Sequence, residues 1–324
     1  MTAQLPLLVH FGDPQHGVDR CARALAESVQ ALRPEIRLAR IERASDAPRV
    51  HIHFTDRLWG ADAESAAAAV EALAADARVA VTVHDVPQRS DGEEGMRRRA
   101  RAYRRVVEVA DVIVCNSEHE RSLLQACTGT DAAIDVIPLP SAVPLVRPAA
   151  GTPRNEVAVL GFFYPGKGHR EVVDAVAVLP EAPAVTAIGR AAPGHEAELA
   201  ELQDYSAGRG VAFTATGFVP DDALLERAQQ VAVPVVAHQH VSASGSLNDW
   251  IAAGRRPITV TNAYFREMAA LRPGTVRLVE PAGLSDAIAA ALEDPAKTWL
   301  SDRAQTGPHA DDVAIAYLAR WSRW

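Results

Sequence analysis

The sequence predicts two α/β domains, each built around a parallel, doubly wound β-sheet. The chain has 324 residues, whereas a single hydrophobic core usually stops growing at about 250–300 residues. Short apolar runs alternate with stretches of helical periodicity, as they do where helices cover both faces of a parallel sheet. Residues 138–153 separate two such series and contain five prolines without periodicity. This segment is therefore predicted to be a domain linker.

The first domain is predicted to span residues 1–150. Apolar runs indicate strands over residues 5–11, 50–54, 79–83, 112–115 and 134–137. Apolar residues at spacings of three and four indicate helices over residues 18–32, around 70–73, over 93–110 and from Ser117 onward.

The second domain is predicted to span residues 151–308 and repeats the alternation. Its strands are expected at residues 157–160, 185–188, 211–213, 231–236 and 257–260, and its helices at 172–179, 196–205, 221–230, 247–253 and 284–292. Residues 309–324 form an amphipathic helix that we expect to pack back on the first domain. Ligands of open parallel sheets bind beyond the carboxyl ends of the strands, so the loops there are the candidate site positions.

Composition narrows the function classes. The net charge of −8 argues against general nucleic-acid binding, which needs a dominant positive field. No segment reaches the roughly 18 apolar residues of a spanning helix, and the first residues lack a basic leader pattern. We therefore expect a cytoplasmic protein, peripheral to the inner face of the membrane at most. Cys21, Cys115 and Cys127 lack metal-ligand spacing and are expected to be buried free thiols.

The strongest candidate for anion binding is the turn from Gly161 to His169, between a predicted strand and a predicted helix. Backbone N–H groups and the helix dipole at such a turn favour an anion, and Lys167 adds a positive charge. The only other lysine is Lys297, so a lysine at this position carries weight. Gly168 stands where a nucleotide P-loop needs Ser or Thr for Mg²⁺, so a P-loop is not expected. A chance lysine in a glycine turn is the alternative.

A second candidate is residues 242–249, which follow the strand at 231–236 and open a helix. Small hydroxyl residues and glycine at a helix N-terminus allow close approach of a diphosphate. Asp249, in the first turn, has the chemistry to hydrogen-bond ribose hydroxyls. Ordinary N-capping explains one serine but not the run Ser244-Gly245-Ser246, so ligand binding is the favoured interpretation.

His84 follows the strand at residues 79–83 and faces the ligand-binding edge of the sheet by topology. An imidazole there suits contact with a sugar hydroxyl or proton transfer, and a structural hydrogen-bonding role is the equal alternative. His51 and His53 alternate on another strand and are expected on one face. No third ligand lies nearby in the sequence, so a metal site is not expected.

Five arginines cluster on one face of the predicted helix at residues 93–110: Arg97, Arg98, Arg101, Arg104 and Arg105. A solvated helix face is the favoured interpretation. Weak peripheral contact with anionic lipid headgroups is the alternative.

Taken in order along nearly the whole chain, short motifs resemble those of the retaining GT-B glycosyltransferases of family 4. They are His16-Gly17-Val18-Asp19-Arg20 and residues 82–87, 110–118, 134–138, 164–168, 216–220 and 249–254. The resemblance implies the GT-B fold, with two Rossmann-like domains facing across a cleft. It also implies transfer of a sugar from a UDP- or GDP-type nucleotide sugar to an unknown acceptor, without a metal ion or other cofactor.

The resemblance also implies roles for individual residues. Lys167 would stabilise the departing diphosphate, and His84 would contact the sugar or the acceptor near the reacting carbon. Donor contacts are expected from Gly17, Gly166, Gly189, Phe218, Ser244, Gly245, Ser246, Asn248 and Asp249. Acceptor contacts are expected from His16, Asp85 and Ser117 in the first domain.

The sequence departs from the family pattern at three positions, the first being His16, which replaces one glycine of a Gly-Gly pair and narrows the space near the diphosphate. Phe162 replaces the usual arginine, and Arg190, Arg255 or Arg256 are candidate substitutes for its charge. Val241 replaces an acid that normally contacts the transferred sugar. Three other functions therefore stay open: a protein that binds a nucleotide sugar without transferring it, another GT-B enzyme such as an epimerase or a phosphorylase, and a P-loop kinase or ATPase.

Overall fold

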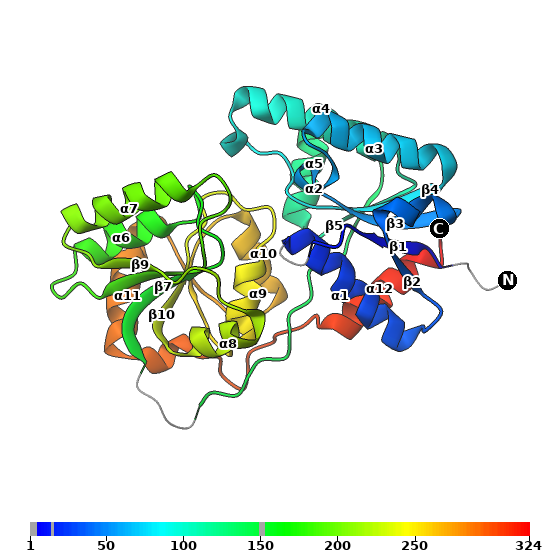
Figure 1. Ribbon diagram of the computed structural model, residues 1–324. Helices are drawn as coiled ribbons and strands as arrows, with labels where there is room; N and C mark the ends of the chain where they lie inside the picture. The colour runs from blue at the N-terminus through cyan, green and yellow to red at the C-terminus, as the bar shows by residue number, and fades with distance from the viewer. Residues whose placement is uncertain (1–4, 14–15, 149–152) are drawn as a thin grey trace. The chain divides into compact units, whose positions relative to one another are not determined.

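The computed structural model describes residues 5–13, 16–148 and 153–324, which form two compact units (Figure 1). The first unit joins the chain up to Pro140 with Pro308–Trp324, and the second is Ser141–Gly307. The expected boundary between residues 150 and 151 lies outside the described residues. Residues 141–148 already belong to the second unit, where the Leu145 N–H donates to the carbonyl oxygen of Ala252 at 2.7 Å.

Within the described residues, the first unit has a parallel sheet in the order β2-β1-β3-β4-β5-β6. Its strands are β1 (Leu7–His10), β2 (Arg37–Arg40), β3 (Arg49–Phe54), β4 (Arg78–Val83), β5 (Val112–Cys115) and β6 (Ile134–Val136). Its helices are α1 (Gly17–Leu32), α2 (Asp56–Trp59), α3 (Ala63–Asp76), α4 (Glu93–Val109), α5 (Glu118–Thr128) and α12 (Ala310–Trp321), with 3-10 turns η1 (Ile41–Asp46) and η2 (Arg89–Asp91). The central strands β3 and β4 are buried on both faces, which explains their nearly continuous apolar runs.

The C-terminal helix α12 packs beside α1 and completes the core of the first unit (Figure 1). Val313, Tyr317 and Trp321 are buried in an apolar cluster shared with α1 and the sheet. The Tyr317 hydroxyl lies 2.9 Å from the Thr82 hydroxyl, and Trp321 Nε1 donates to His51 Nδ1 at 2.9 Å. Residues far apart in the sequence therefore share both apolar and polar contacts in this core.

In the part of the chain that is described, the second unit has a parallel sheet in the order β12-β11-β10-β7-β8-β9. Its strands are β7 (Arg154–Leu160), β8 (Ala184–Ile188), β9 (Phe213–Ala215), β10 (Val231–Val236), β11 (Ile258–Val260) and β12 (Arg277–Val279). Its helices are α6 (His169–Ala177), α7 (Glu196–Gly208), α8 (Asp221–Gln229), α9 (Gly245–Ala252), α10 (Ala263–Leu271) and α11 (Leu284–Glu293), with 3-10 turns η3 (Pro281–Gly283) and η4 (Pro295–Thr298). Strands β7 and β10 are neighbours, so the two loops that follow them leave the same edge of the sheet.

Several elements differ from the expected ones. The edge strands β2 and β12 were not predicted, because β2 is Arg-Leu-Ala-Arg and β12 is a half-buried Arg-Leu-Val. Helix α10 was also missed, although Asn262 caps it by accepting from the Phe265 N–H at 2.9 Å. Strand β9 begins at Phe213 rather than two residues earlier.

A buried arginine ties the amino-terminal edge of the second sheet together. Arg255 is fully buried, and its guanidinium donates to the carbonyl oxygens of Ala228, Gln229, Val231, Ala232 and Thr298 at 2.6–3.2 Å. Burial lowers the pKa of Arg255 to about 9. These contacts lie at the start of β10, so Arg255 is wrong as a substitute for the missing charge at the carboxyl edge. Arg256 is wrong for the same reason, since its Nε donates to Val276 O, just before β12.

Replacing Arg255 with methionine should lower the free energy of unfolding by about 3 kcal/mol or more, because several buried carbonyl groups would lose their donor. Urea denaturation of the two proteins measures the change. The matched control is Arg266→Met, which removes only an exposed ion pair with Glu280 and should cost less than about 1 kcal/mol. Equal effects of the two substitutions would contradict the structural role of Arg255.

Candidate functional site

The turn after β7 and the loop after β10 meet at the carboxyl edge of the second sheet. Lys167 is buried, with 7% of its surface exposed, and its Nζ donates to Ser246 Oγ at 3.2 Å. Lys167 makes no ion pair with any residue that the structure describes. The turn at residues 161–169 and the segment at residues 242–249 therefore form a single candidate site, with the buried Lys167 ammonium at its centre.

Glycines allow this close arrangement. Gly168 has a φ of +99°, and a Cβ there would lie 2.3 Å from the carbonyl oxygen of Ala237. Gly189 has a φ of +151°, and a Cβ there would lie 2.2 Å from the carbonyl oxygen of Gly161. A side chain at either position would push apart the loops that surround Lys167.

Burial determines which side chains of this candidate site are charged. Desolvation lowers the pKa of Lys167 to about 8, and the nearby charge of Asp249 opposes that change. His169 and His238 are also buried, and desolvation and the Lys167 charge lower the pKa of both rings, that of His169 to about 3. Both imidazoles are neutral at pH 7, so Lys167 carries the positive charge of this cluster. His238 is a site residue without a predicted role, although its place after the apolar run of β10 parallels that of His84 after β4.

The N-terminus of α9 contributes serine hydroxyls with different functions. Ser244 is the N-cap and accepts from the Leu247 N–H at 3.2 Å. The Ser246 hydroxyl lies 3.3 Å from that of Ser244 and accepts from Lys167. Capping thus accounts for Ser244 but not for Ser246. Gly245 is exposed, and a Cβ there would meet nothing within 4 Å.

The other expected donor residues lie on the same edge, with different surroundings. Asn248 and Asp249 are half-buried in the first turns of α9, and Asn248 Oδ1 accepts from Arg272 Nη1 at 3.2 Å. Phe218 follows β9 with 60% of its surface exposed. Gly166 is half-buried in the lysine turn. Their roles as donor contacts stay predictions.

Two positions depart from the expected pattern of charge. The ring of Phe162 lies 5.4 Å from the Arg190 guanidinium, which follows β8 at the same sheet edge. Arg190 is therefore the remaining candidate for the charge that Phe162 lacks. Val241 is buried in an apolar cluster with Leu247 and Trp250. Its side chain therefore packs in the core, and no carboxylate is present at this position.

In the first unit, His84 is held inside the protein by both ring nitrogens. Asn116 Nδ2 donates to His84 Nδ1 at 3.4 Å, and Glu120 Oε2 fixes that amide at 3.0 Å. His84 Nε2 therefore carries the proton that it donates to His53 Nδ1 at 3.0 Å. Burial lowers the pKa of His84 to about 4. His84 is a neutral member of a buried chain, and its expected catalytic role remains untested.

The expected grouping of His51 and His53 on one face is confirmed, because their ring centroids lie 5.5 Å apart. Within the described part of the chain, no three His, Cys, Asp or Glu side chains are arranged to hold a metal ion.

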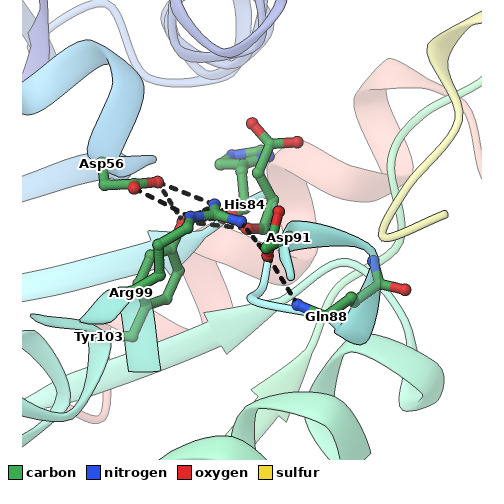
Figure 2. A network of polar contacts seen from close by, with 7 residues as sticks. Asp56, His84, Gln88, Asp91, Arg99 and Tyr103 are labelled. Carbon is green, nitrogen blue, oxygen red and sulfur yellow. Dashed lines mark hydrogen bonds and ion pairs between the residues drawn. The ribbon is translucent and has the colours of Figure 1, made fainter. Parts of the chain in front are cut away.

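A network that the sequence analysis overlooked lies beside the end of β4 (Figure 2). Arg99 forms two hydrogen bonds with Asp56, at 2.8 and 2.9 Å, and a third with Asp91 Oδ2 at 2.6 Å. The three side chains line a hollow of about 570 Å³ between α2, the start of α3 and α4. Arg99 lies within a run of arginines, so its burial had no distinct signal in the sequence.

The remaining acceptor-side residues have local structural contacts. His16 is the N-cap of α1, and its Nδ1 accepts from the Val18 N–H at 3.2 Å, while Gly17 is exposed. Ser117 is fully buried and caps α5 by accepting from the Glu120 N–H at 3.0 Å. Capping accounts for the buried hydroxyl of Ser117, whereas Asp85 is exposed.

Most arginines on the outer face of α4 have acidic or carbonyl partners. Arg97 pairs with Glu93 of its own helix, Arg101 and Arg105 pair with acids of α3, and Arg104 donates to Thr128 O. Arg98 forms no ion pair or carbonyl contact with the described residues, but its charge helps to lower the pKa of nearby Asp62. These partners favour an ion-paired, solvated face, and membrane contact stays a prediction.

Comparison with known proteins agrees with this architecture. Residues 15–140 match the model of Glycosyltransferase Family 4. HepE of Anabaena in complex with UDP-glucose is similar in structure, with 14% sequence identity and a TM-score of 0.68 over 97% of this chain and 94% of that chain. The sucrose-phosphate synthase of Thermosynechococcus elongatus is 17% identical, with a TM-score of 0.70 over 99% and 97% of the two chains. The chain has the GT-B fold. No curated protein sequence matches it.

The expected doubly wound α/β class of this GT-B protein is thus confirmed. The expectation of three buried thiols is wrong in part, because only Cys115 is buried, whereas Cys21 and Cys127 are half-exposed, although all three are free. Among the described residues, no helix combines the length and the apolar character needed to cross a bilayer.

The buried histidines of this GT-B protein predict acid sensitivity. Burial lowers the pKa of His51 to about 3 and that of His84 to about 4, whereas both would titrate near 6.5 when unfolded. The unfolded chain therefore binds protons first as the pH falls. The contribution of these histidines to the free energy of unfolding is fully present above pH 6.5. It should decline toward pH 4 by up to about 1.4 kcal/mol per pH unit for each ring.

Urea denaturation between pH 7.5 and 4.5 measures this slope. His84→Gln should reduce it by about one proton, and His240→Gln, at an exposed position, serves as the matched control. A slope that is the same in His84→Gln and in the unmodified protein would contradict the assignment.

Proposed function

We propose that this protein transfers a hexose from a UDP- or GDP-type nucleotide sugar to a hydroxyl-bearing acceptor, with retention of configuration and without a metal ion. The observation that carries the proposal is the buried Lys167 ammonium, whose Nζ donates to Ser246 at the N-terminus of α9. A buried cation beside helix N–H groups suits a diphosphate. The Glycosyltransferase Family 4 match and the GT-B fold support the same function.

The chemistry follows from charge. When the bond between the sugar and the diphosphate breaks, negative charge grows on the departing phosphate. Lys167 and the free backbone N–H groups in the first turn of α9 stabilise that charge, because the fold already orients them. The Lys167 pKa of about 8 leaves most of this lysine charged at pH 7.

The donor is held by residues along the same edge. Asp249 holds the ribose hydroxyls, and the exposed Phe218 ring contacts the base. Gly166 lies beside the diphosphate, Gly189 contributes through its backbone by allowing the Gly161 turn to pack closely, and Arg190 supplies the second positive charge. HepE in complex with UDP-glucose has the same fold, which supports a nucleotide sugar as the ligand.

The first unit binds the acceptor through the loops at the carboxyl edge of its sheet, among them His16 and Asp85. We place the protein in the cytoplasm, with any membrane contact weak and peripheral. Incubation with a panel of UDP-, GDP- and ADP-sugars tests the proposal, because transfer or hydrolysis releases the nucleoside diphosphate. The absence of release from the entire panel would contradict it.

A second candidate function is binding of a nucleotide sugar without transfer. Val241, which packs in an apolar cluster, favours it, because no carboxylate is available at that position. Thermal stabilisation by a nucleotide sugar without release of nucleotide would support this function and exclude the first.

Lys167→Ala should lower the turnover number by about a hundredfold or more, as expected for loss of a group that stabilises charge in the transition state. The sequence offers a matched control, since Lys297 is the only other lysine and is exposed. Lys297→Ala should keep the full rate of nucleotide release. A Lys167→Ala enzyme as fast as this control would remove Lys167 from the site.

The pH profile gives an independent test. The kcat/KM for the nucleotide sugar should fall above pH 8, because the free enzyme then loses the Lys167 proton. In Lys167→Arg this fall should disappear, since a guanidinium stays charged throughout the range. An identical alkaline limb in both proteins would assign it to another group.

A further inference from the structure

The backbone at Asp85 is held in an unfavourable conformation. Among the described residues, Asp85 is the only one other than glycine with a positive φ, at +49°. This left-handed region is costly for residues with a Cβ, and it persists only where surrounding contacts enforce it. Asp85 follows directly after His84 at the carboxyl end of β4.

Two side chains of α4 enforce this conformation by binding backbone carbonyl groups. Arg99 Nη2 donates to the carbonyl oxygen of Asp85 at 2.7 Å. The Tyr103 hydroxyl donates to the carbonyl oxygen of His84 at 2.8 Å, with that of Asp85 3.1 Å away. Both carbonyl groups are therefore fixed from the same helix.

The two side chains are themselves fixed (Figure 2). Asp56 and Asp91 bind the other nitrogens of the Arg99 guanidinium, and Asp91 also accepts from the Gln88 N–H at 2.9 Å. Arg99 and Asp56 are buried, so these charge-assisted hydrogen bonds are shielded from water. We call Arg99, Tyr103, Asp56 and Asp91 the α4 clamp.

The carboxylate of Asp85 has none of these contacts. The residue is exposed, and its side chain makes no hydrogen bond or ion pair with the described residues. The α4 clamp thus stabilises the strained backbone of Asp85, although the exposed side chain of Asp85 is not packed in the core. Strained backbone of this kind is typical of ligand-binding positions, where it fixes the direction of a functional group.

We propose that Asp85 binds a hydroxyl group of the sugar acceptor, and that Arg99 and Tyr103 are the positioning residues that aim its carboxylate. The inference rests on the proposed glycosyl transfer and specifies how the first unit holds the acceptor. A carboxylate accepts hydrogen bonds from two directions, which suits a polyol. The α4 clamp fixes the turn before the acceptor arrives, so that binding does not have to order it.

The test uses the nucleotide sugar that gives the fastest release in the panel above, with glucose, galactose, mannose and glycerol as acceptor probes. Asp85→Asn keeps a side chain that tolerates a positive φ but removes the charge. Asp85→Gly removes both the carboxylate and the backbone strain. Tyr103→Phe removes only the hydroxyl of the clamp, and Tyr205→Phe, which loses a hydrogen bond to Asp174 in the second unit, is the matched control.

Asp85→Asn and Asp85→Gly should each raise the acceptor KM by about tenfold or more, as expected for loss of a hydrogen bond to a charged group. Tyr205→Phe should keep the donor KM and the acceptor KM within about twofold of the unmodified protein, whereas an equal rise of both KM values in the Asp85 variants would contradict an acceptor contact. Asp85→Gly should also raise the thermal unfolding temperature, because glycine adopts the positive φ without cost. A residue with a purely structural role would lose stability and activity together.

A double-mutant cycle tests the positioning role. Tyr103→Phe should raise the acceptor KM severalfold in the unmodified background and have no further effect in Asp85→Gly, where no carboxylate remains to be aimed. Additive effects, or an unchanged acceptor KM in the Asp85 variants of an active enzyme, would overturn this inference and leave glycosyl transfer intact. An unmodified protein that releases no nucleotide from the panel would instead reject the proposed function.

Discussion

The second unit depends on a buried ammonium that forms no ion pair with the residues that the structure describes. Lys167 lies under turns whose glycines leave no room for a Cβ, and its Nζ donates to a serine hydroxyl rather than to a carboxylate. Burying this cation is costly and lowers its pKa, and the nearby charge of Asp249 offsets only part of that change. Retaining such a group is favourable when an anion completes the site, and the N-terminus of α9 directs N–H groups toward the same place.

The first unit handles charge in the opposite way. Its histidines at the carboxyl edge are buried and neutral, and its buried arginine is saturated by two aspartates and a carbonyl group. Among the described residues at that edge, Asp85 presents an exposed carboxylate. The cationic site in the second unit suits a diphosphate, which needs positive charge. The exposed carboxylate in the first unit suits an acceptor hydroxyl, which needs a hydrogen-bond acceptor, so the two groups fit the two substrates of the proposed glycosyl transfer.

Topology made the Lys167 and Ser246 pair predictable, although 79 residues separate them. Loops that follow parallel strands leave one edge of the sheet, and β7 and β10 are neighbours. The buried strands were equally clear, because both faces are apolar. The edge strand β2 was hidden by its two arginines. Helical periodicity places Tyr103 on the buried, apolar face of α4, which gives no sign of the hydrogen bonds that its hydroxyl makes. Periodicity reports which face is buried, but it does not report which polar atoms meet there.

Comparing Arg255 with Lys167 distinguishes a buried cation that stabilises the fold from one that is available to a ligand. Both are buried cations of the second unit with lowered pKa values. Arg255 spreads its donors over five carbonyl groups, so its desolvation is offset within the protein and its loss is a loss of stability. Lys167 has three N–H donors and uses one of them on Ser246. Donors that folding leaves unused in a buried place are the ones available to a ligand, and this criterion identifies Lys167 independently of any similarity in sequence.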